Sequence, residues 1–177
     1  PVTLGHLDII ERAAELFDEV IVLVMSNKSK KTSLFTIEER IDLMKRTIHS
    51  DNVKIDTYDG LLVNYAEQKG AVAIVKGLRA MSDFEYEFQQ ALTNKSLYPK
   101  VETIFLTSEG KNMFLSSSMV KEVCSLGGDI SSFVPKEIIN DIASGRDDIE
   151  MTTRIGDLAT GLEIVQSYDL DDFDIII

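Results

Sequence analysis

A Thr-x-Gly-His run stands at the start of the sequence, formed by Thr3, Gly5 and His6, and it leads directly into an amphipathic helix pattern. A helix N-terminus carries unpaired backbone N–H groups and the positive end of the helix dipole, and both suit a phosphate group. Gly5 would let the backbone come close to such a ligand. His6 could donate a hydrogen bond to an oxygen on which charge builds in a transition state. The run therefore predicts a nucleotide-phosphate site at the start of this helix.

Three further segments carry cations or hydroxyl groups, and each follows a predicted strand: Lys30 with Lys31, residues 76–79, and residues 112–118. Ligands of open parallel sheets bind beyond the carboxyl ends of the strands, so we expect all of these segments to converge on one edge of a sheet. The residues concerned are Lys76, Gly77, Leu78 and Arg79 in one run, and Asn112, Met113, Phe114, Leu115, Ser116, Ser117 and Ser118 in the other.

Each of these features also has a simpler interpretation when it is taken alone. A His or Ser triplet at the start of a helix is often only a cap, and lysines in a loop are often only solvated. Four such segments at equivalent strand ends favour a common site instead. The sequence shows no paired carboxylates beside them, no His/Cys cluster for zinc and no Ser-His-Asp arrangement. Phosphoryl or nucleotidyl transfer needs none of these, because it depends mainly on positioning and electrostatics.

Apolar residues recur with alternating helical and strand spacing along the chain. Two pairs, Thr36 with Glu39 and Ser82 with Glu85, have the spacing of a capping box at a helix N-terminus. Gly70 suits the C-terminal end of a helix. The pattern predicts strands over 20–25, 53–55, 71–75 and 101–107, and helices over 7–17, 36–48, 61–69, 82–97, 116–126 and 136–143.

Strands that alternate with helices imply an α/β fold in which an open parallel sheet of Rossmann-like type has helices on both faces. The pattern begins on a helix, so we expect the first strand of such a sheet to be absent from the chain. We expect this domain to cover residues 1–146 and an acidic C-terminal extension to cover residues 147–177.

The net charge of −12 is concentrated in that extension, which carries −8 and leaves −4 for the rest of the chain. A nucleic-acid partner is therefore not expected, because no basic face of sufficient size is available. No apolar run approaches the roughly 18 residues that span a bilayer, so we expect no membrane segment. The single cysteine, Cys124, fits a buried core position in a protein of the reducing cytoplasm.

The last residues of the extension are unusual, because three isoleucines, Ile175–Ile177, follow a strongly acidic stretch. The composition favours an extension that is in part without stable structure, with a short helix over 155–165. The alternative is that the isoleucines, which have high β-propensity, fill the vacant central strand position in this chain or in a neighbouring copy.

Several segments together resemble bacterial phosphopantetheine adenylyltransferase, a member of the nucleotidyltransferase superfamily. They are PVTLGHLDIIERA, SKKTSLFTIEER, VKGLRAMSDFEYEFQQALTN, FLSSSMVKEV and GGDISSFVP, and they occur in the order and at the spacing of that family over about residues 1–145. The Thr-x-Gly-His run marks the superfamily, whereas GLRAMSDFEYE and SSSMVKE are specific to this family. The resemblance implies transfer of an adenylyl group from ATP to 4′-phosphopantetheine, which gives dephospho-CoA and pyrophosphate in coenzyme A biosynthesis. It also implies Mg²⁺ as cofactor and a homohexamer.

The resemblance also implies roles for individual residues. His6 would stabilise the transition state, with Lys30 and Arg79 as the other catalytic residues. Lys30, Leu62 and Lys76 would bind phosphopantetheine. The ATP site would consist of His6, Gly77, Leu78, Arg79, Glu87, Asn112, Met113, Phe114, Leu115, Ser116, Ser117 and Ser118.

The sequence departs from the family pattern at three places. Lys76 stands where the family often has Arg, and a point charge there replaces a bidentate fork. Asn112 stands where an aromatic residue is common. The family has a strand and a Gly-Ser/Thr-Phe-Asp turn before the position that matches Pro1. Two functions therefore stay open, a working adenylyltransferase and a catalytically impaired nucleotide- or CoA-binding protein or fragment. A superfamily member with a different phosphorylated acceptor is less compatible with the GLRAMSDFEYE segment.

Overall fold

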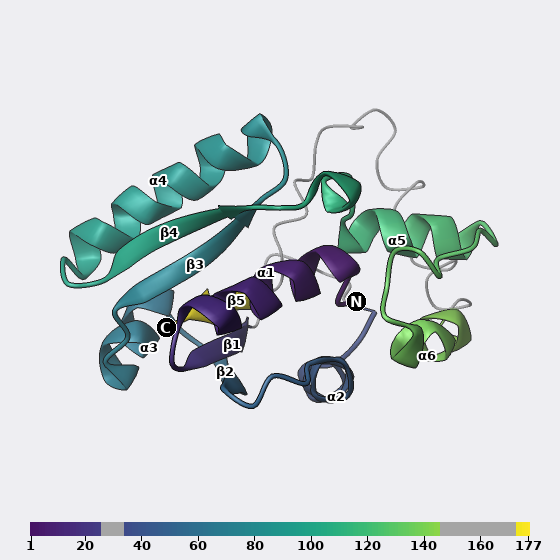
Figure 1. Ribbon diagram of the computed structural model, residues 1–177, viewed down its shortest axis with the longest axis horizontal. Coiled ribbons are helices and arrows are strands. Elements are labelled where there is room, and N and C mark those ends of the chain that lie inside the picture. The colour runs from purple at the N-terminus through teal and green to yellow at the C-terminus, as the bar shows by residue number, and fades with distance from the viewer. Residues whose placement is uncertain (26–33, 146–172) are drawn as a thin grey trace.

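The computed structural model describes residues 1–25, 34–145 and 173–177. In this part of the chain, helices and strands alternate as the sequence predicts (Figure 1). The elements are α1 (Leu4–Leu16), β1 (Val20–Met25), α2 (Ile37–Thr47), β2 (Val53–Tyr58), α3 (Leu62–Lys69), β3 (Ala73–Leu78), α4 (Met81–Leu97), β4 (Glu102–Thr107), the 3₁₀ turn η1 (Gly110–Asn112), α5 (Ser117–Ser125), the 3₁₀ turn η2 (Lys136–Ile138), α6 (Ile139–Ser144) and β5 (Phe173–Ile176).

Local signals account for most of the helix ends. Thr36 and Glu39 form the predicted capping box at the start of α2. Gly70 ends α3 in the left-handed conformation, with φ 67°, which glycine adopts without steric cost. The capping box predicted for Ser82 and Glu85 is wrong. Helix α4 begins at Met81 with Ala80 as its N-cap, so Ser82 already lies inside the first turn.

The five strands form one sheet in the order β2-β1-β5-β3-β4. Strands β1 and β2 are parallel, as are β3 and β4, whereas β5 is antiparallel to both of its neighbours. The prediction of an open α/β sheet is confirmed, but the expectation of a purely parallel sheet is wrong. The sheet is mixed because the C-terminal residues supply its central strand in the reverse direction.

Strand β5 is held on both sides by main-chain pairing. Ile175 pairs with Val22 on β1 and with Val75 on β3, and both Ile175 and Ile176 are buried. Ile177 donates to the carbonyl of Ala73 at 2.9 Å and accepts from the backbone N–H of Val72 at 2.6 Å. Of the two alternatives for these residues, the central strand is the one observed, and the interpretation as unstructured extension is wrong for residues 173–176. The helix expected over 155–165 lies outside the described residues.

Apolar side chains cover the sheet on both faces. On one face α1 and α2 pack through Ile10, Ala13 and Met44 against alternate residues of the strands, including Val22 and Ile175. On the other face α3 packs through Val63 and Ala66, and Ile176 lies in this second cluster. The alternation within β5 therefore places one isoleucine in each core, as expected for a strand buried on both faces.

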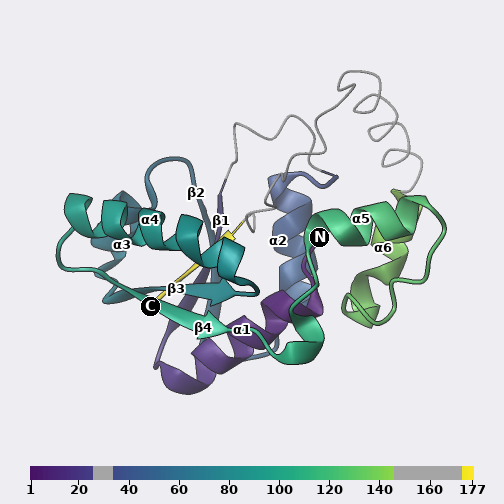
Figure 2. The ribbon, with the colours of Figure 1, turned by 90° about the horizontal axis from the view of Figure 1, so that it is seen from above.

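A third apolar cluster joins α5 and α6 to the start of α1 and to α2. It contains Val2, Leu43, Val120, Ile138 and Ile142, and the predicted core residue Cys124 also belongs to it. In both ribbon views the N-terminus lies beside α5, whereas the C-terminus lies at the far end of the sheet (Figures 1 and 2). This packing brings the start of α1 and the start of α5 together at the carboxyl edge of β3 and β4.

Candidate active site

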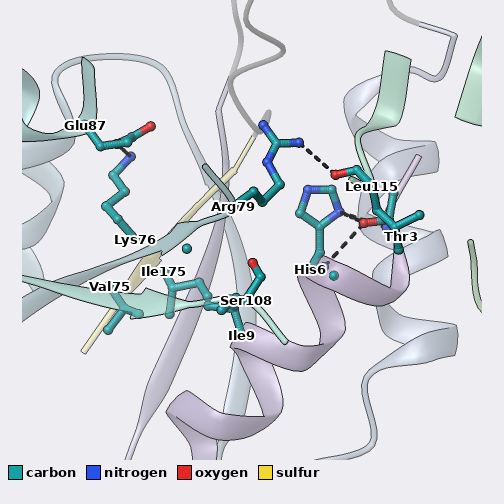
Figure 3. A pocket seen from close by; sticks show the side chains of 12 residues that line it. Thr3, His6, Ile9, Val75, Lys76, Arg79, Glu87, Ser108, Leu115 and Ile175 are labelled. Carbon is teal, nitrogen blue, oxygen red and sulfur yellow. Dashed lines mark hydrogen bonds and ion pairs between the residues drawn. The ribbon is translucent and has the colours of Figure 1, made fainter. Parts of the chain in front are cut away.

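The start of α1 is held by a capping box in which His6 is a partner. Thr3 is the N-cap, and its backbone N–H donates to Nδ1 of His6 at 2.8 Å. An N–H group can only donate, so Nδ1 must present its lone pair and the ring proton of His6 lies on Nε2. The side chain of His6 is buried, with 8% exposed, and it lines a pocket at the edge of the sheet. The local helix cap thus fixes both the tautomer and the direction of the imidazole (Figure 3).

Strand β3 and the residues after it bring two cations to the same pocket. Lys76 and Arg79 both line it, together with Gly77. Nζ of Lys76 lies 3.5 Å from Oε2 of Glu87 on α4, and these side chains are only 14% and 12% exposed. Figure 3 shows this pair on the side of the pocket opposite His6. A nearly buried carboxylate therefore holds the ammonium group at the pocket wall.

Arg79 is held by contacts to α4 and to the segment before α5. Its Nε lies 3.2 Å from Oδ2 of Asp83, and its Nη1 donates to the carbonyl of Leu115 at 2.8 Å. These contacts join the end of β3 to the segment before α5. Gly77 has a packing reason to be glycine, because a Cβ there would lie 3.0 Å from Cγ1 of Ile9. Leu78 is the last residue of β3, does not line the pocket, and accepts the backbone N–H of Ser108 at 2.9 Å.

The segment from Asn112 to Ser118 reaches the pocket only in part. Leu115 lines it, whereas Asn112 is buried against Gly5, and Met113 and Phe114 are largely exposed. Ser116 is the N-cap of α5 and accepts the backbone N–H of Met119 at 3.1 Å. The hydroxyl of Ser117 donates to the carbonyl of Pro1 at 2.7 Å, and Ser118 follows it in the first turn of α5. The start of α5 thus lies next to the start of α1.

The structure therefore brings together six of the predicted residues around one pocket, namely His6, Lys76, Gly77, Arg79, Glu87 and Leu115. Leu62 lies elsewhere, in a groove between the start of α3 and α4 that is also lined by Met25, Tyr86 and Leu97. Tyr86 in the groove and Glu87 in the pocket are adjacent residues of α4. Lys30 lies outside the described residues, so its predicted place stays a prediction.

The pocket is also lined by Thr3 and Gly5 of the Thr-x-Gly-His run. Four further lining residues belong neither to that run nor to the predicted site residues: Ile9, Val75, Ser108 and Ile175. Ile9 and Val75 could have been found from their spacing to His6 and Lys76, and Ser108 from its place just after β4. Ile175 could be named from the sequence only as part of an alternative central strand, and its place in the pocket could not be predicted because the partners and direction of that strand are set by residues far away in the sequence.

The donor set of the pocket is cationic and hydroxylic. Among the described residues, no group of three His, Cys, Asp or Glu side chains lies close enough to hold a metal ion. Among the lining residues that the structure describes, Glu87 alone carries a carboxylate, and it faces Lys76. Such a set fits a magnesium ion that is held by the oxygens of a nucleotide triphosphate and by water, since Mg²⁺ commonly keeps several waters and uses few protein ligands. Within the same described ranges, no helix is long and apolar enough to cross a membrane.

Comparison with known proteins agrees with this arrangement. The sequence profile of the cytidylyltransferase-like family matches residues 1–123. The chain is 53% identical to a phosphopantetheine adenylyltransferase of Heliobacterium modesticaldum over 140 residues, which is 78% of this chain and 83% of the relative. It is 58% identical over 136 residues to the enzyme of that name from Dictyoglomus turgidum, which is 76% of this chain and 84% of the relative. It is 51% identical over 140 residues to the phosphopantetheine adenylyltransferase of Alkaliphilus metalliredigens, which is 78% of this chain and 88% of the relative.

The matched residues include α1, β3, α4 and the start of α5, the elements that surround the pocket. A helix N-terminus, two cations and a buried imidazole thus meet at the strand ends, where the sequence analysis predicts a nucleotide-phosphate site. The chain belongs to the cytidylyltransferase-like family and, within it, to the phosphopantetheine adenylyltransferases.

Proposed function

We propose that this protein transfers the adenylyl group of ATP to 4′-phosphopantetheine, with dephospho-CoA and pyrophosphate as products. The observation that carries the proposal is the convergence of His6, Lys76 and Arg79 on one pocket at the carboxyl edge of the sheet. The names of the similar proteins support this choice of reaction. Cations and helix N-termini at such an edge suit two phosphorylated substrates.

The reaction is a direct displacement at phosphorus. An oxygen of the 4′-phosphate of phosphopantetheine forms a bond to the α-phosphorus of ATP, and the bond from that phosphorus to the bridging oxygen of the β-phosphate breaks. Nε2–H of His6 donates to an α-phosphoryl oxygen as negative charge builds there. No side chain forms a covalent intermediate, and positioning supplies most of the acceleration.

Lys76 and Arg79 hold the two reacting groups. Lys76 neutralises the phosphate of the acceptor, and Glu87 fixes the direction of its ammonium group. Arg79, held by Asp83 and Leu115, faces the phosphates of ATP together with the N-terminus of α5. Magnesium, bound to the triphosphate, would reduce the charge of the leaving pyrophosphate. Lys30 is proposed as a further contact to the phosphates.

The remaining predicted residues fit around this centre. Gly77 and Leu78 at the end of β3, together with the segment from Asn112 to Ser118, would surround the nucleotide, with the exposed side chains of Met113 and Phe114 at its rim. The pantetheine arm would lie along the groove that contains Leu62 and Tyr86, since this groove is partly apolar and begins beside Glu87 on α4.

Two features beyond the pocket complete the proposal. A homohexamer is supported by exposed apolar residues on α4, where Phe88 and Leu92 are 44% and 57% exposed. A cytoplasmic location is supported by the single, buried and reduced cysteine, Cys124. The division into a catalytic domain of residues 1–146 and an acidic extension of residues 147–177 is likewise proposed, with β5 as the part of the extension that joins the sheet.

One observation favours a second function, a nucleotide- or CoA-binding protein without turnover. Strand β5 runs antiparallel to its neighbours β1 and β3, so the sheet position next to the phosphate site contributes the apolar side chain of Ile175 rather than a turn with N–H donors. Such a wall would bind a nucleotide less tightly and would position it less well.

Product analysis separates the two functions. The whole chain is incubated with ATP, Mg²⁺ and either 4′-phosphopantetheine or pantetheine, and products are identified by mass spectrometry. Dephospho-CoA formed only with the phosphorylated acceptor is the expected result. Thermal stabilisation by ATP or CoA without any dephospho-CoA would support the binding protein instead and would contradict the proposed reaction.

A further inference from the structure

Two side chains outside the pocket, Asp8 and Arg12, tie α1 to the segment that follows β4. Nη1 of Arg12 donates to the carbonyl of Thr107 at 2.7 Å. Oδ2 of Asp8 accepts the backbone N–H of Glu109 at 3.2 Å and lies 3.5 Å from Nη1 of Arg12. Neither side chain lines the pocket. One carboxylate and one guanidinium thus bridge two segments that are about a hundred residues apart in the sequence.

These contacts have the properties of a fixed anchor rather than of a solvated surface pair. The side chain of Asp8 is only 9% exposed, while that of Arg12 is 37% exposed. The carboxylate accepts a backbone N–H group at the residue that caps η1, so its hydrogen bond is charge-assisted. Asp8 and Arg12 are one helical turn apart and lie on one face of α1, and the rigid helix sets the position of both.

The segment that begins at this anchor is the one that surrounds the nucleotide in the proposed function. After η1, Asn112 packs against Gly5 and is 4% exposed. Leu115 then reaches the pocket and accepts from Arg79. At the far end Ser117 donates to the carbonyl of Pro1. The segment is thus fastened to the start of α1 at the far end, and Asp8 and Arg12 fasten its near end.

We propose that Asp8 and Arg12 are positioning residues that hold the segment 108–118 in place for ATP. The inference rests on the proposed function for the identity of the nucleotide. Its physical basis is that a prearranged segment loses less conformational freedom when the ligand binds, so the anchor lowers the cost of binding ATP. In the proposed function the acceptor phosphate is bound by Lys76, which pairs with Glu87 on α4, so we expect the anchor to act on ATP and not on the acceptor.

The first test compares kinetic constants in variants of the full chain. Asp8→Ala removes the hydrogen bond from Glu109 and the ion pair with Arg12, whereas Asp8→Asn keeps an oxygen that can accept the N–H of Glu109. Glu11→Gln, an exposed carboxylate on the same helix, is the matched control. We expect Asp8→Ala to raise KM for ATP roughly tenfold, the usual effect of losing one charge-assisted hydrogen bond, with KM for phosphopantetheine unchanged. Asp8→Asn should recover part of this loss.

A second measurement reads the segment directly, without turnover. Amide hydrogen exchange at residues 109–115 should be faster in Asp8→Ala than in Glu11→Gln, while exchange in β1 and β3 stays the same. ATP affinity measured by calorimetry without acceptor should fall in Asp8→Ala. Equal ATP affinity in the two variants, or equal changes in KM for both substrates, would overturn the proposal.

These measurements also keep the inference distinct from the proposed reaction. A chain that binds ATP but forms no dephospho-CoA would contradict the reaction, and a weaker ATP affinity in Asp8→Ala would still support the anchor. A chain that does not bind ATP at all would contradict both, because the segment would then have no nucleotide to hold.

Discussion

The role of His6 depends on which of its two ring nitrogens carries the proton. Nδ1 accepts from the Thr3 backbone, and this contact forms half of a capping box at the start of α1. The other nitrogen then carries the proton that the proposed mechanism needs. His6 is therefore both the partner of the N-cap Thr3 and the proposed donor. The interpretation as part of a helix cap and the interpretation as a site residue do not exclude each other.

Lys76 offers a prediction at the level of one side chain. The ammonium group is a point charge held 3.5 Å from Glu87, and an arginine in its place could bind the acceptor phosphate with two parallel hydrogen bonds. We expect Lys76→Arg to lower KM for phosphopantetheine and Lys76→Met to raise it, each by about tenfold. Steady-state kinetics with varied acceptor give the result, and Lys100→Arg at an exposed turn is the control. Equal KM values in both Lys76 variants would contradict a contact with the acceptor.

Tyr65 and Asp56 give a prediction about pH. The hydroxyl of Tyr65 donates to Oδ2 of Asp56 at 2.6 Å, and this bond, with a smaller contribution from Lys69, holds the pKa of Asp56 below its ordinary value. Burial, and then the bond to Asp56, raises the pKa of Tyr65. A lowered carboxyl pKa contributes stability that is present above the unfolded value of about 3.9 and is lost as pH falls through the folded value.

Replacing Tyr65 by Phe should therefore reduce the free energy of unfolding at neutral pH. The difference from the wild type should shrink as the pH falls below about 4, because Asp56 is then protonated first in the unfolded chain and, at lower pH, in the folded wild type as well. Urea unfolding at a series of pH values measures this. A difference that is constant down to pH 3 would mean that the pairing with Asp56 contributes nothing.

At the level of elements, the sequence predicted most of the fold because its signals were local. The apolar run of β1, the Thr36–Glu39 box of α2 and the Gly70 end of α3 all act within a few residues. Strand β5 could be named only as an alternative. Three isoleucines indicate a strand, but its partners β1 and β3 lie far away in the sequence. Its direction depends on the end of the sheet at which the chain enters between them. The contact of Lys76 with Glu87 was equally invisible, since it joins two elements through their packing angle.

Strand β5 is the element that joins the two halves of the sheet. It separates β1 with β2 from β3 with β4, and all main-chain pairing between the halves runs through it. Ile176→Ala should lower the free energy of unfolding by about 2–5 kcal/mol, because this fully buried side chain would leave a cavity. Val72→Ala, at a side chain that is 65% exposed, is the matched control. Urea unfolding curves that coincide for both variants would contradict the place of β5 in the core.

At the level of the whole molecule, α4 carries exposed apolar side chains, among them Phe88 and Leu92, in the part of the chain that the structure describes. If copies associate there, Leu92→Asp should shift the protein to a smaller molar mass, since burying an unpaired charge at an interface is costly. Leu126→Asp carries the same change at an exposed leucine that ends α5, and α5 lies on the opposite side of the molecule from α4 (Figure 2). Light scattering after size exclusion gives the masses. A hexamer that persists in Leu92→Asp would exclude this face as the contact.

The whole arrangement also explains why the site was partly predictable. Helices and strands in alternation must bring their strand ends to one edge, so His6, Lys76 and Arg79 could be grouped from order alone. The groove of Leu62 could not be separated from the pocket in this way, because both open beside α4 and differ only in which side chains of that helix line them.

The central claim is that the pocket around His6 carries out adenylyl transfer, and pyrophosphate release tests it most directly. The assay follows pyrophosphate release from ATP with 4′-phosphopantetheine and Mg²⁺ for the wild type, His6→Ala and His49→Ala. His49 is exposed and does not line the pocket, so it serves as the control. The account predicts that kcat falls roughly 10²–10³-fold in His6→Ala, the usual effect of losing one donor to a charged oxygen, and stays unchanged in His49→Ala. Equal turnover in all three proteins would contradict it.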